Sequence, residues 1–407
     1  MAELQATHPL ERFYTDEHPE LGTGPVPTEP YVSREYFEQE RAHIFRNAWL
    51  LACHESEIPR PGDFVVKHAA IFNASILIVR GRDGVVRAFH NVCRHRGNKV
   101  VCESEHGHTE ALFCKFHGWT YALDGRLRGV PEQDRFRGFD KSQHGLKPFT
   151  MQMWKGFVFV HAQEHPQQSL REYLGTLADP LEAFPFEQMR PFAHYSTTLR
   201  SNWKVGVNAF QEAYHVPTVH AVSARSLFVC RLCDFRFHGP HRAMTLPISP
   251  DFKPKPVEIL SSRFTTGMSQ NAVEMSSTGR FPGTNPCNTP NYSFDINIVF
   301  PSSFIDVGEG YYFTYEFWPI EVDQVHFIMK LYTLPAQKWS QRIGQELSRI
   351  FLREGISEDL STLETTQEGL QSGALPHMVL SDQEIAIRHQ YRVIEDILRS
   401  VCGSRAR

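Results

Sequence analysis

The chain has 407 residues, enough for two or three domains and for a hydrophobic core that needs no disulfide support. Its 42 Lys and Arg residues against 46 Asp and Glu residues give a net charge of -4, which offers no electrostatic basis for binding nucleic acid or an anionic membrane. The first ten residues lack a basic segment followed by an apolar one, and no run approaches the roughly 18 apolar residues of a membrane span. We therefore expect a cytoplasmic globular protein.

A helix and a small β domain are predicted in the first part of the chain. The spacing of apolar residues over 33–46 predicts a helix, and Ser33 is the predicted N-cap. Between about Gly62 and Ala162, short β-rich runs are separated by Gly and Asp turns, a pattern typical of a small antiparallel β domain. These runs are Phe64–Val66, Ala74–Val79, Val85–Phe89 and Gly156–Val160.

After Pro166 the pattern becomes mixed, which predicts a larger α+β domain with an antiparallel sheet. Helices are expected near 170–184, near 201–220 and from Lys338 to the end, and strands near 296–300, 311–317 and 325–331. We predict an N-terminal lead and helix (1–45) that packs on the larger domain, a β domain (46–165) inserted before it, and the α+β domain itself (166–407).

Two Cys/His pairs lie inside the β domain. Cys93 and His95 are two positions apart, Cys114 and His117 are three apart, and eighteen residues separate His95 from Cys114. Each pair can lie on one tight loop, and a β scaffold can bring the two loops together. The pattern C-x-H followed by C-x2-H is the Rieske signature, in which a [2Fe-2S] cluster has Cys ligands on one iron and His ligands on the other.

A single zinc ion is the alternative, because tetrahedral zinc takes the same two Cys and two His ligands. The common zinc spacings are C-x2-4-C and H-x3-5-H, so the C-x-H step favours the cluster. The remaining cysteines show no comparable pattern, and the isolated CxxC of Cys230 and Cys233 has no second half. We assign no role to Cys53, Cys102, Cys230, Cys233, Cys287 or Cys402.

A second metal site is predicted in the segment 202–220. On a regular helix Asn208, Glu212 and His215 fall within about 60° of one another, whereas His220 lies about 140° from His215. Pro217 disfavours a continuous helix, so we expect the chain to bend there and bring His220 back. Two His and one carboxylate form the facial triad of non-haem Fe(II) oxygenases. For the carboxylate, spacing leaves open Asp306, Glu309, Asp359 and Asp382.

Both motifs, in this order and separation, make the chain resemble the Rieske non-haem iron oxygenase (ring-hydroxylating oxygenase) alpha-subunit family. Segments 37–49, 57–64, 202–220 and 358–364 resemble the corresponding stretches of the family. The resemblance implies His215, His220 and Asp359 as iron ligands, with Glu358 as the rival to Asp359. It also implies that Glu212 bridges the iron site to a cluster His of a neighbouring subunit. Asn208 matches a family position near the iron.

The resemblance implies a terminal oxygenase that uses O2, and electrons from NAD(P)H, for monooxygenation of a small aromatic or substituted-amine compound. Hydroxylation and oxidative N- or O-dealkylation both belong to this class. Glu212 favours this reading, since many dihydroxylating members have Asp there. The alternatives are a cis-dihydroxylating aromatic-ring dioxygenase and a Rieske electron-transfer protein without oxygenase activity. The length of the chain after Pro166 opposes the second alternative.

The expected partners follow from the same reading. The sequence contains no G-x-G-x-x-G after a strand and no plant-type ferredoxin cysteine pattern, so we expect a separate reductase, with or without a ferredoxin component. The family resemblance further implies a homotrimer. For the substrate pocket, Ala209, Phe210, Ile296–Phe300 and Ser302 are the candidates.

Overall fold

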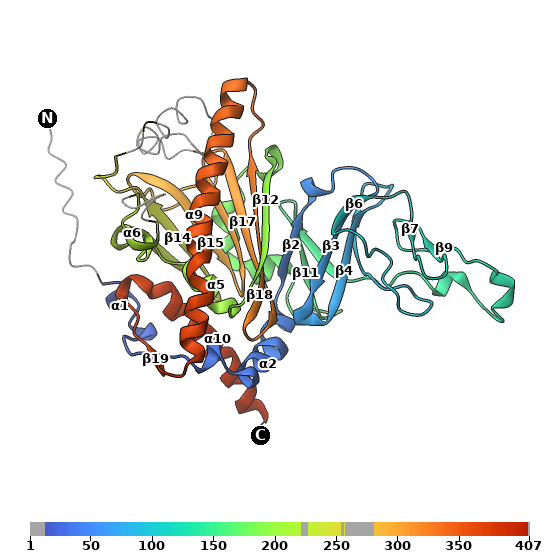
Figure 1. The fold of residues 1–407 in the computed structure, drawn as a ribbon, viewed down its shortest axis with the longest axis horizontal. Helices are drawn as coiled ribbons and strands as arrows, with labels where there is room; N and C mark the ends of the chain where they lie inside the picture. The colour runs from blue at the N-terminus through green and yellow to red at the C-terminus, as the bar shows by residue number, and fades with distance from the viewer. Residues whose placement is uncertain (1–12, 221–226, 254–255, 257–280, 406–407) are drawn as a thin grey trace.

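The computed structural model describes residues 13–220, 227–253, 256 and 281–405, and it has the predicted α+β architecture. A small β-rich half stands beside a larger half in which helices cover a wide sheet (Figure 1). No helix within the described residues is long and apolar enough to cross a membrane.

The small half contains two antiparallel sheets. One has the strand order β5-β4-β3-β6, and the other has the order β7-β8-β9. Their strands are β3 (Asp63–Ala69), β4 (Ala74–Arg80), β5 (Val86–His90), β6 (His106–His108), β7 (Leu112–Phe113), β8 (Thr120–Tyr121) and β9 (Leu127–Gly129). The predicted runs at 64–66, 74–79 and 85–89 are thus confirmed as β3, β4 and β5.

The structure has two further small antiparallel sheets. A three-stranded sheet has the order β10-β11-β2, and a two-stranded sheet joins β1 to β19. The strands are β1 (Val26–Pro27), β2 (Leu50–His54), β10 (Thr150–Trp154), β11 (Phe157–His161) and β19 (His377–Met378). The predicted strand at 156–160 is therefore β11.

The large half is built on a seven-stranded antiparallel sheet of order β12-β18-β17-β16-β15-β14-β13. Its strands are β12 (Arg190–Leu199), β13 (Asp234–His238), β14 (His241–Pro247), β15 (Tyr292–Val299), β16 (Ser303–Gly308), β17 (Tyr311–Glu321) and β18 (Gln324–Thr333). Side chains alternate between the two faces. Phe304 and Phe313 belong to one apolar core, whereas Ile305 and Tyr312 belong to the other.

Helices cover both faces of this sheet. Trp203 and Leu363 join the core of Phe304 and Phe313, while Leu170 and Leu181 join the opposite core. The helices are α1 (Tyr14–Glu17), α2 (Arg34–His43), α3 (Leu170–Leu174), α4 (Ala178–Leu181), α5 (Trp203–Ala209), α6 (Val216–Val219), α9 (Trp339–Gln371) and α10 (Ile385–Arg405). As predicted, Ser33 caps α2, since its hydroxyl accepts a hydrogen bond from the Tyr36 amide at 3.2 Å.

Helix α2 is fastened to the large half through a buried carboxylate. Glu40 accepts hydrogen bonds from the Trp203 indole at 3.0 Å and from the Lys204 ammonium at 2.6 Å. Both donors belong to the first turn of α5. The N-terminal helix thereby supports the segment that carries the predicted iron ligands.

Two predicted helices are wrong in their extent. The segment 170–184 is divided into α3 and α4 by a 3-10 turn at Gly175–Leu177. The segment 201–220 is divided into α5 and α6, and residues 210–215 between them are not helical. Pro217 does not cause the break, because it lies in the first turn of α6, where a missing N–H group costs nothing.

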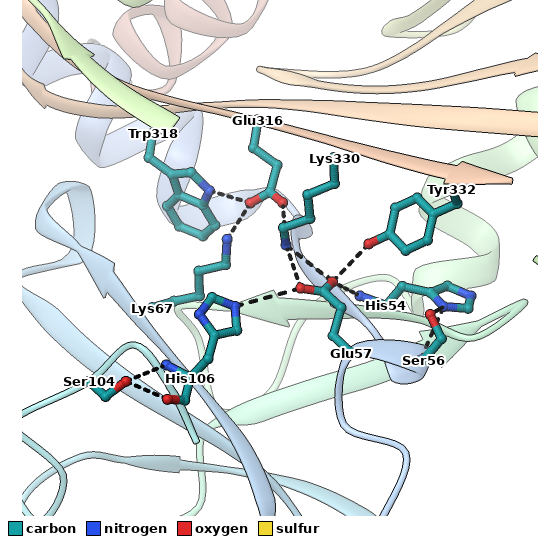
Figure 2. A network of polar contacts seen from close by, with 10 residues as sticks. All are labelled: His54, Ser56, Glu57, Lys67, Ser104, His106, Glu316, Trp318, Lys330 and Tyr332. Carbon is teal, nitrogen blue, oxygen red and sulfur yellow. Dashed lines mark hydrogen bonds and ion pairs between the residues drawn. The ribbon is translucent and has the colours of Figure 1, made fainter. Parts of the chain in front are cut away.

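A buried charge network joins the two halves (Figure 2). Lys67 of β3 lies 2.6 Å from Glu316 of β17, and Lys330 of β18 lies 3.0 Å from Glu57 and 3.3 Å from Glu316. The Trp318 indole and the Tyr332 hydroxyl donate further hydrogen bonds to the two carboxylates, at 2.8 and 2.9 Å. Two positive charges face two negative charges, so the network balances its own charge.

Candidate metal centres

The two Cys/His pairs lie on two loops of the same construction. The Gly97 amide donates to the carbonyl of Cys93 at 3.1 Å, and the Gly118 amide donates to the carbonyl of Cys114 at 2.9 Å. Both glycines have positive φ angles, +80° and +72°, which residues with a side chain rarely adopt. Each loop therefore reverses directly after its ligands and keeps them on one tight turn.

The second ligand loop, with Cys114 and His117, connects β7 to β8, and β7 and β9 lie in the small half (Figure 1). Cys93 and Cys114 are buried, and the imidazole rings of His95 and His117 lie 4.6 Å apart and are partly exposed. The His95 ring stacks on Trp119, with 4.9 Å between ring centroids. Thiols on the inside and imidazoles near the surface are the arrangement expected if the His-ligated iron is the outer one.

The loops fit a two-iron cluster better than a zinc ion. The C-x-H spacing of Cys93 and His95 departs from the common zinc spacings C-x2-4-C and H-x3-5-H. Nδ1 of His95 is buried and has no hydrogen-bond partner, as expected for a nitrogen that ligates a metal. The Tyr121 hydroxyl lies 3.2 Å from the Cys93 sulfur, and contacts of this kind tune a cluster.

A second group of metal-binding side chains comes from three places in the chain. His215 precedes α6, His220 follows it, and Asp359 lies on α9. Oδ1 of Asp359 lies 3.3 Å from Nε2 of His215 and 2.9 Å from Nε2 of His220. Within the described residues this is the one group of three or more such side chains whose ligand atoms lie within 4.8 Å of one another.

The Asp359 carboxylate indicates that this group holds a cation. Its Oδ1 is buried, and neither imidazole approaches it with the geometry of a hydrogen bond. A buried carboxylate oxygen without a donor is costly unless a cation neutralises it. Two imidazoles and one carboxylate on one side of a metal are the ligand set of non-haem Fe(II) oxygenases.

Two further carboxylates hold the imidazoles in place. Oε1 of Glu212 lies 2.5 Å from Nδ1 of His215, and Oε2 of Glu358 lies 2.9 Å from Nδ1 of His220. Each Nδ1–H group can therefore donate to a carboxylate, which turns each Nε2 toward Asp359, the side on which a metal would bind. Glu358, the rival for the ligand position, thus contacts the far side of His220.

The imidazoles are strongly basic when no metal competes with protons. Burial by itself lowers the pKa of His215, but the contacts with Asp359 and Glu212 outweigh burial and raise the pKa to about 10. The pKa of His220 is also raised, since Asp359 and Glu358 outweigh burial there. The surroundings favour positive charge, which a divalent metal supplies without any added proton.

Asn208 does not join this group. Its amide nitrogen donates to the Tyr31 hydroxyl at 2.9 Å, and its oxygen accepts from Gln211 at 2.9 Å. Gln211 also donates to Gln390 of α10 at 3.0 Å. The network supports the turn between α5 and Glu212, which makes Asn208 a positioning residue in this geometry.

The other predicted candidates lie elsewhere. Asp382 accepts hydrogen bonds from the Tyr14 and Thr15 amides at 2.8 and 2.9 Å, and Asp306 is buried on β16. Among the pocket candidates, Phe210, Ile296 and Ile298 belong to the core on the α5 side of the sheet. Ala209 packs against that same core, to which Phe300 also belongs. Val299 belongs to the opposite core.

Reasoning from sequence missed two groups of supporting residues. Tyr121 and Trp119 contact cluster ligands, but nothing in the spacing of the ligands points to them. The family resemblance offers Glu358 only as a rival ligand, whereas its place beside Asp359 is the signal that points to a contact with the same pair of imidazoles. Cys402 lies in α10, but its side chain is outside the described residues.

Family models match both halves of the chain. The model of the Rieske [2Fe-2S] domain matches residues 48–149, and that of the ring hydroxylating alpha subunit (catalytic domain) matches residues 186–400. The chain belongs to the ring-hydroxylating oxygenase alpha-subunit family. The predicted division at 46–165 and 166–407 stays a prediction, because matched ranges do not fix domain boundaries.

The curated relatives of this ring-hydroxylating alpha subunit include monooxygenase subunits. The carnitine monooxygenase oxygenase subunit of Acinetobacter pittii (strain PHEA-2) is 32% identical over 219 residues, which cover 53% of this chain and 57% of the relative. The glycine betaine monooxygenase oxygenase subunit of Pseudomonas aeruginosa (strain UCBPP-PA14) is 34% identical over 202 residues, covering 50% and 46%. This chain therefore spans about half the length of these relatives.

Solved structures share the whole fold. A quaternary ammonium Rieske monooxygenase is similar with a TM-score of 0.73 and 22% sequence identity, covering 93% of this chain and 96% of the other. Naphthalene 1,2-dioxygenase from Rhodococcus sp. gives the same TM-score, identity and coverage. The fold is thus common to a monooxygenase and a dioxygenase, so it does not by itself select the reaction.

Proposed function

We propose that this alpha subunit is the terminal component of a Rieske monooxygenase that oxidatively removes an alkyl group from, or hydroxylates, a substituted amine. The observation that carries the proposal is the convergence of His215, His220 and Asp359, backed by a carboxylate behind each imidazole. Cys93, His95, Cys114 and His117 would hold a [2Fe-2S] cluster. The iron bound by the facial triad would supply the O2 chemistry.

The protein's own contribution is to fix the ligands. Glu212 and Glu358 accept the Nδ1 protons of His215 and His220, so both rings keep one tautomer and one orientation. The main chain adds to this, since the His215 amide donates to Glu212 at 3.2 Å. The non-helical segment 210–215 lets Glu212 fold back against His215, which a continuous helix would hold less closely.

We propose that electrons cross between subunits. In Figure 1 the loops next to β7 and β9 lie at one end of the molecule, and α6 lies at the other, on the far side of the seven-stranded sheet. The cluster of one chain is therefore poorly placed to reduce the iron of the same chain. A neighbouring subunit in a homotrimer would bring its His95 or His117 to Glu212, and a solved quaternary ammonium Rieske monooxygenase is described in terms of inter-subunit electron transfer.

The amine substrate is proposed from the relatives and from Glu212. Carnitine, glycine betaine and N,N-dimethyl phenylurea give their names to three relatives, the last of them an N-demethylase subunit from Sphingobium sp. (strain YBL2) that is 30% identical over 231 residues, covering 53% of this chain and 49% of the relative. All three compounds carry methylated nitrogen. A separate NAD(P)H-oxidising reductase, with or without a ferredoxin, would supply the electrons.

The test is product analysis with the metal-loaded subunit, a Rieske oxygenase reductase, NADH and labelled O2. With an N-methylated amine we expect formaldehyde and the demethylated amine, and in a stable C-hydroxylated product a single labelled oxygen atom. A cis-diol that carries two labelled atoms would contradict the proposal and support the dioxygenase alternative. Reduction and reoxidation of the cluster without any oxygenated product would support the electron-carrier alternative.

A further inference from the structure

Asp306 is a buried carboxyl group with no positively charged partner among the described residues. The side chain is 1% exposed. Its Oδ1 accepts a hydrogen bond from the Asn297 amide at 3.0 Å, but its Oδ2 is buried and has no hydrogen-bond partner. An unsatisfied buried carboxylate oxygen destabilises a fold, so its presence calls for an explanation.

Asp295, on the neighbouring strand β15, is the contrasting case. It is also 1% exposed, but it accepts hydrogen bonds from the Thr245 hydroxyl at 2.5 Å, the Asn285 amide at 2.8 Å and the Tyr292 hydroxyl at 3.0 Å. The Arg236 guanidinium lies 3.9 Å away. Asp295 is therefore a satisfied structural residue, and Asp306 is not.

The alternation of β16 places Asp306 on the face of the sheet that bears the iron ligands. Phe304, two residues earlier on the same face, packs against Phe210 and Tyr315, with ring centroids 6.4 and 5.7 Å apart. Phe210 lies two residues before Glu212. Burial above all raises the pKa of Tyr315 well above its usual value, and the negative charges of Asp306 and then Asp359 add to the rise.

Aromatic rings surround this position. Phe313 is the cross-strand partner of Asp306, and its ring lies 5.5 Å from that of Phe294, 5.3 Å from that of Tyr315 and 6.0 Å from that of Tyr311. Ring faces attract organic cations, and a desolvated carboxylate attracts them more strongly. No Lys or Arg of the described residues forms an ion pair with Asp306.

We propose that Asp306 selects a positively charged substrate. The Oδ2 atom of Asp306 binds the positively charged nitrogen of an alkylated amine, and the aromatic rings of β15, β16 and β17 lie against the alkyl groups of that amine. The inference rests on the proposed function, because it concerns the substrate of the same iron site. It adds that the substrate binds as a cation. Burial above all raises the pKa of Asp306 well above its usual value, so cation binding would also release a proton from the carboxyl group.

The test compares two ligands of nearly the same shape. N,N-dimethylbenzylamine is a cation near neutral pH, and isobutylbenzene has CH in place of its NH+ group. Isothermal titration calorimetry of the metal-loaded subunit, without reductant or reductase, should show the cation binding at least about tenfold more tightly. In Asp306→Asn that preference should fall to about twofold or less. The cation should bind more weakly, and the binding of isobutylbenzene should not change.

Asp295→Asn is the matched control, and thermal unfolding is the second measurement. Asp295→Asn should lower the melting temperature and keep the preference for the cation, because its donors serve the fold. Asp306→Asn should leave the melting temperature unchanged or raise it, since the Oδ2 atom that it replaces has no hydrogen-bond partner to lose. A lower melting temperature with an unchanged preference would make Asp306 a structural residue and overturn the inference.

Two other outcomes would also overturn it. One is equal binding of both ligands by the wild-type subunit, and the other is an Asp306→Asn variant that binds the cation normally but turns it over slowly, which would assign a proton-donating role instead. A failure of the proposed function would give a different result from a failure of this inference. A subunit that prefers the cation but releases no formaldehyde retains this inference and contradicts the proposed function.

Discussion

Two groups of buried charges in this alpha subunit differ in how they are neutralised. At the junction of the two halves, Lys67 and Lys330 face Glu57 and Glu316, and the charges cancel within the protein (Figure 2). At the iron site, the carboxylates of Glu212, Glu358 and Asp359 face two imidazoles, so a negative charge is left over even when both imidazoles are protonated. The first group balances its own charge, and the second needs an added cation. Buried charge that the chain leaves unbalanced therefore indicates where a ligand binds.

The largest effect is expected from removing the central carboxylate. Asp359→Ala deletes the carboxylate that lies against both imidazoles, so we expect iron to be lost from this site and turnover to fall by at least about a hundredfold. Steady-state NADH-dependent product formation measures the loss. The visible spectrum of the cluster should not change, and retained turnover would assign the ligand to another carboxylate.

Breaking the balanced network should affect stability and leave the metals in place. Lys330→Ala removes the charge between Glu57 and Glu316, and leaving buried carboxylates without a partner costs about 3–5 kcal/mol. The free energy of unfolding in denaturant measures the loss. The matched control is Lys147→Ala, which breaks the exposed ion pair with Glu164 and should cost about 1 kcal/mol or less. Similar losses in the two variants would contradict the contrast.

The two outer carboxylates allow a finer comparison. Glu212→Gln and Glu358→Gln each replace an acceptor of an imidazole Nδ1 proton, and such changes typically cost 10–100-fold in metal affinity or activity. We expect weaker iron binding in both variants. With iron restored, the transfer of electrons from the reduced cluster should be slow in Glu212→Gln alone, as measured by single-turnover oxidation of the cluster. Equal rates would count against the bridge.

The smallest effect concerns pH. Burial by itself raises the pKa of Glu57, but the charge of Lys330, the His106 imidazole 3.7 Å away and the hydrogen bond from the His54 amide outweigh burial and hold it well below its usual value of 4.5. A carboxylate with a depressed pKa stabilises the fold above its unfolded-state pKa, and this contribution is lost as the pH falls. Below about pH 4.5 the unfolding free energy of Glu57→Gln should therefore depend less steeply on pH than that of the wild type. Identical slopes would contradict the assignment.

The sequence predicts what is local and misses what depends on tertiary contacts. The cluster motif could be read because each Cys and its His lie on one short loop, and His215 and His220 lie close in the chain. Asp359 follows from no spacing, since α9 is brought to α6 only by the packing of the large half. The predicted break at Pro217 is wrong, since the non-helical turn lies at 210–215. Gln211 holds this turn through contacts with Asn208 and with Gln390, which is distant in the sequence. Asp306 looks like any carboxylate until its burial is known.

The most direct test of the account is the iron and acid-labile sulfide content of the purified subunit and of Asp359→Ala. We predict about three irons and two sulfides per wild-type chain, two irons belonging to the cluster and one to the facial triad. The variant should hold about two irons, with unchanged sulfide and an unchanged visible spectrum. Zinc in place of iron and sulfide, or three irons in Asp359→Ala, would contradict it.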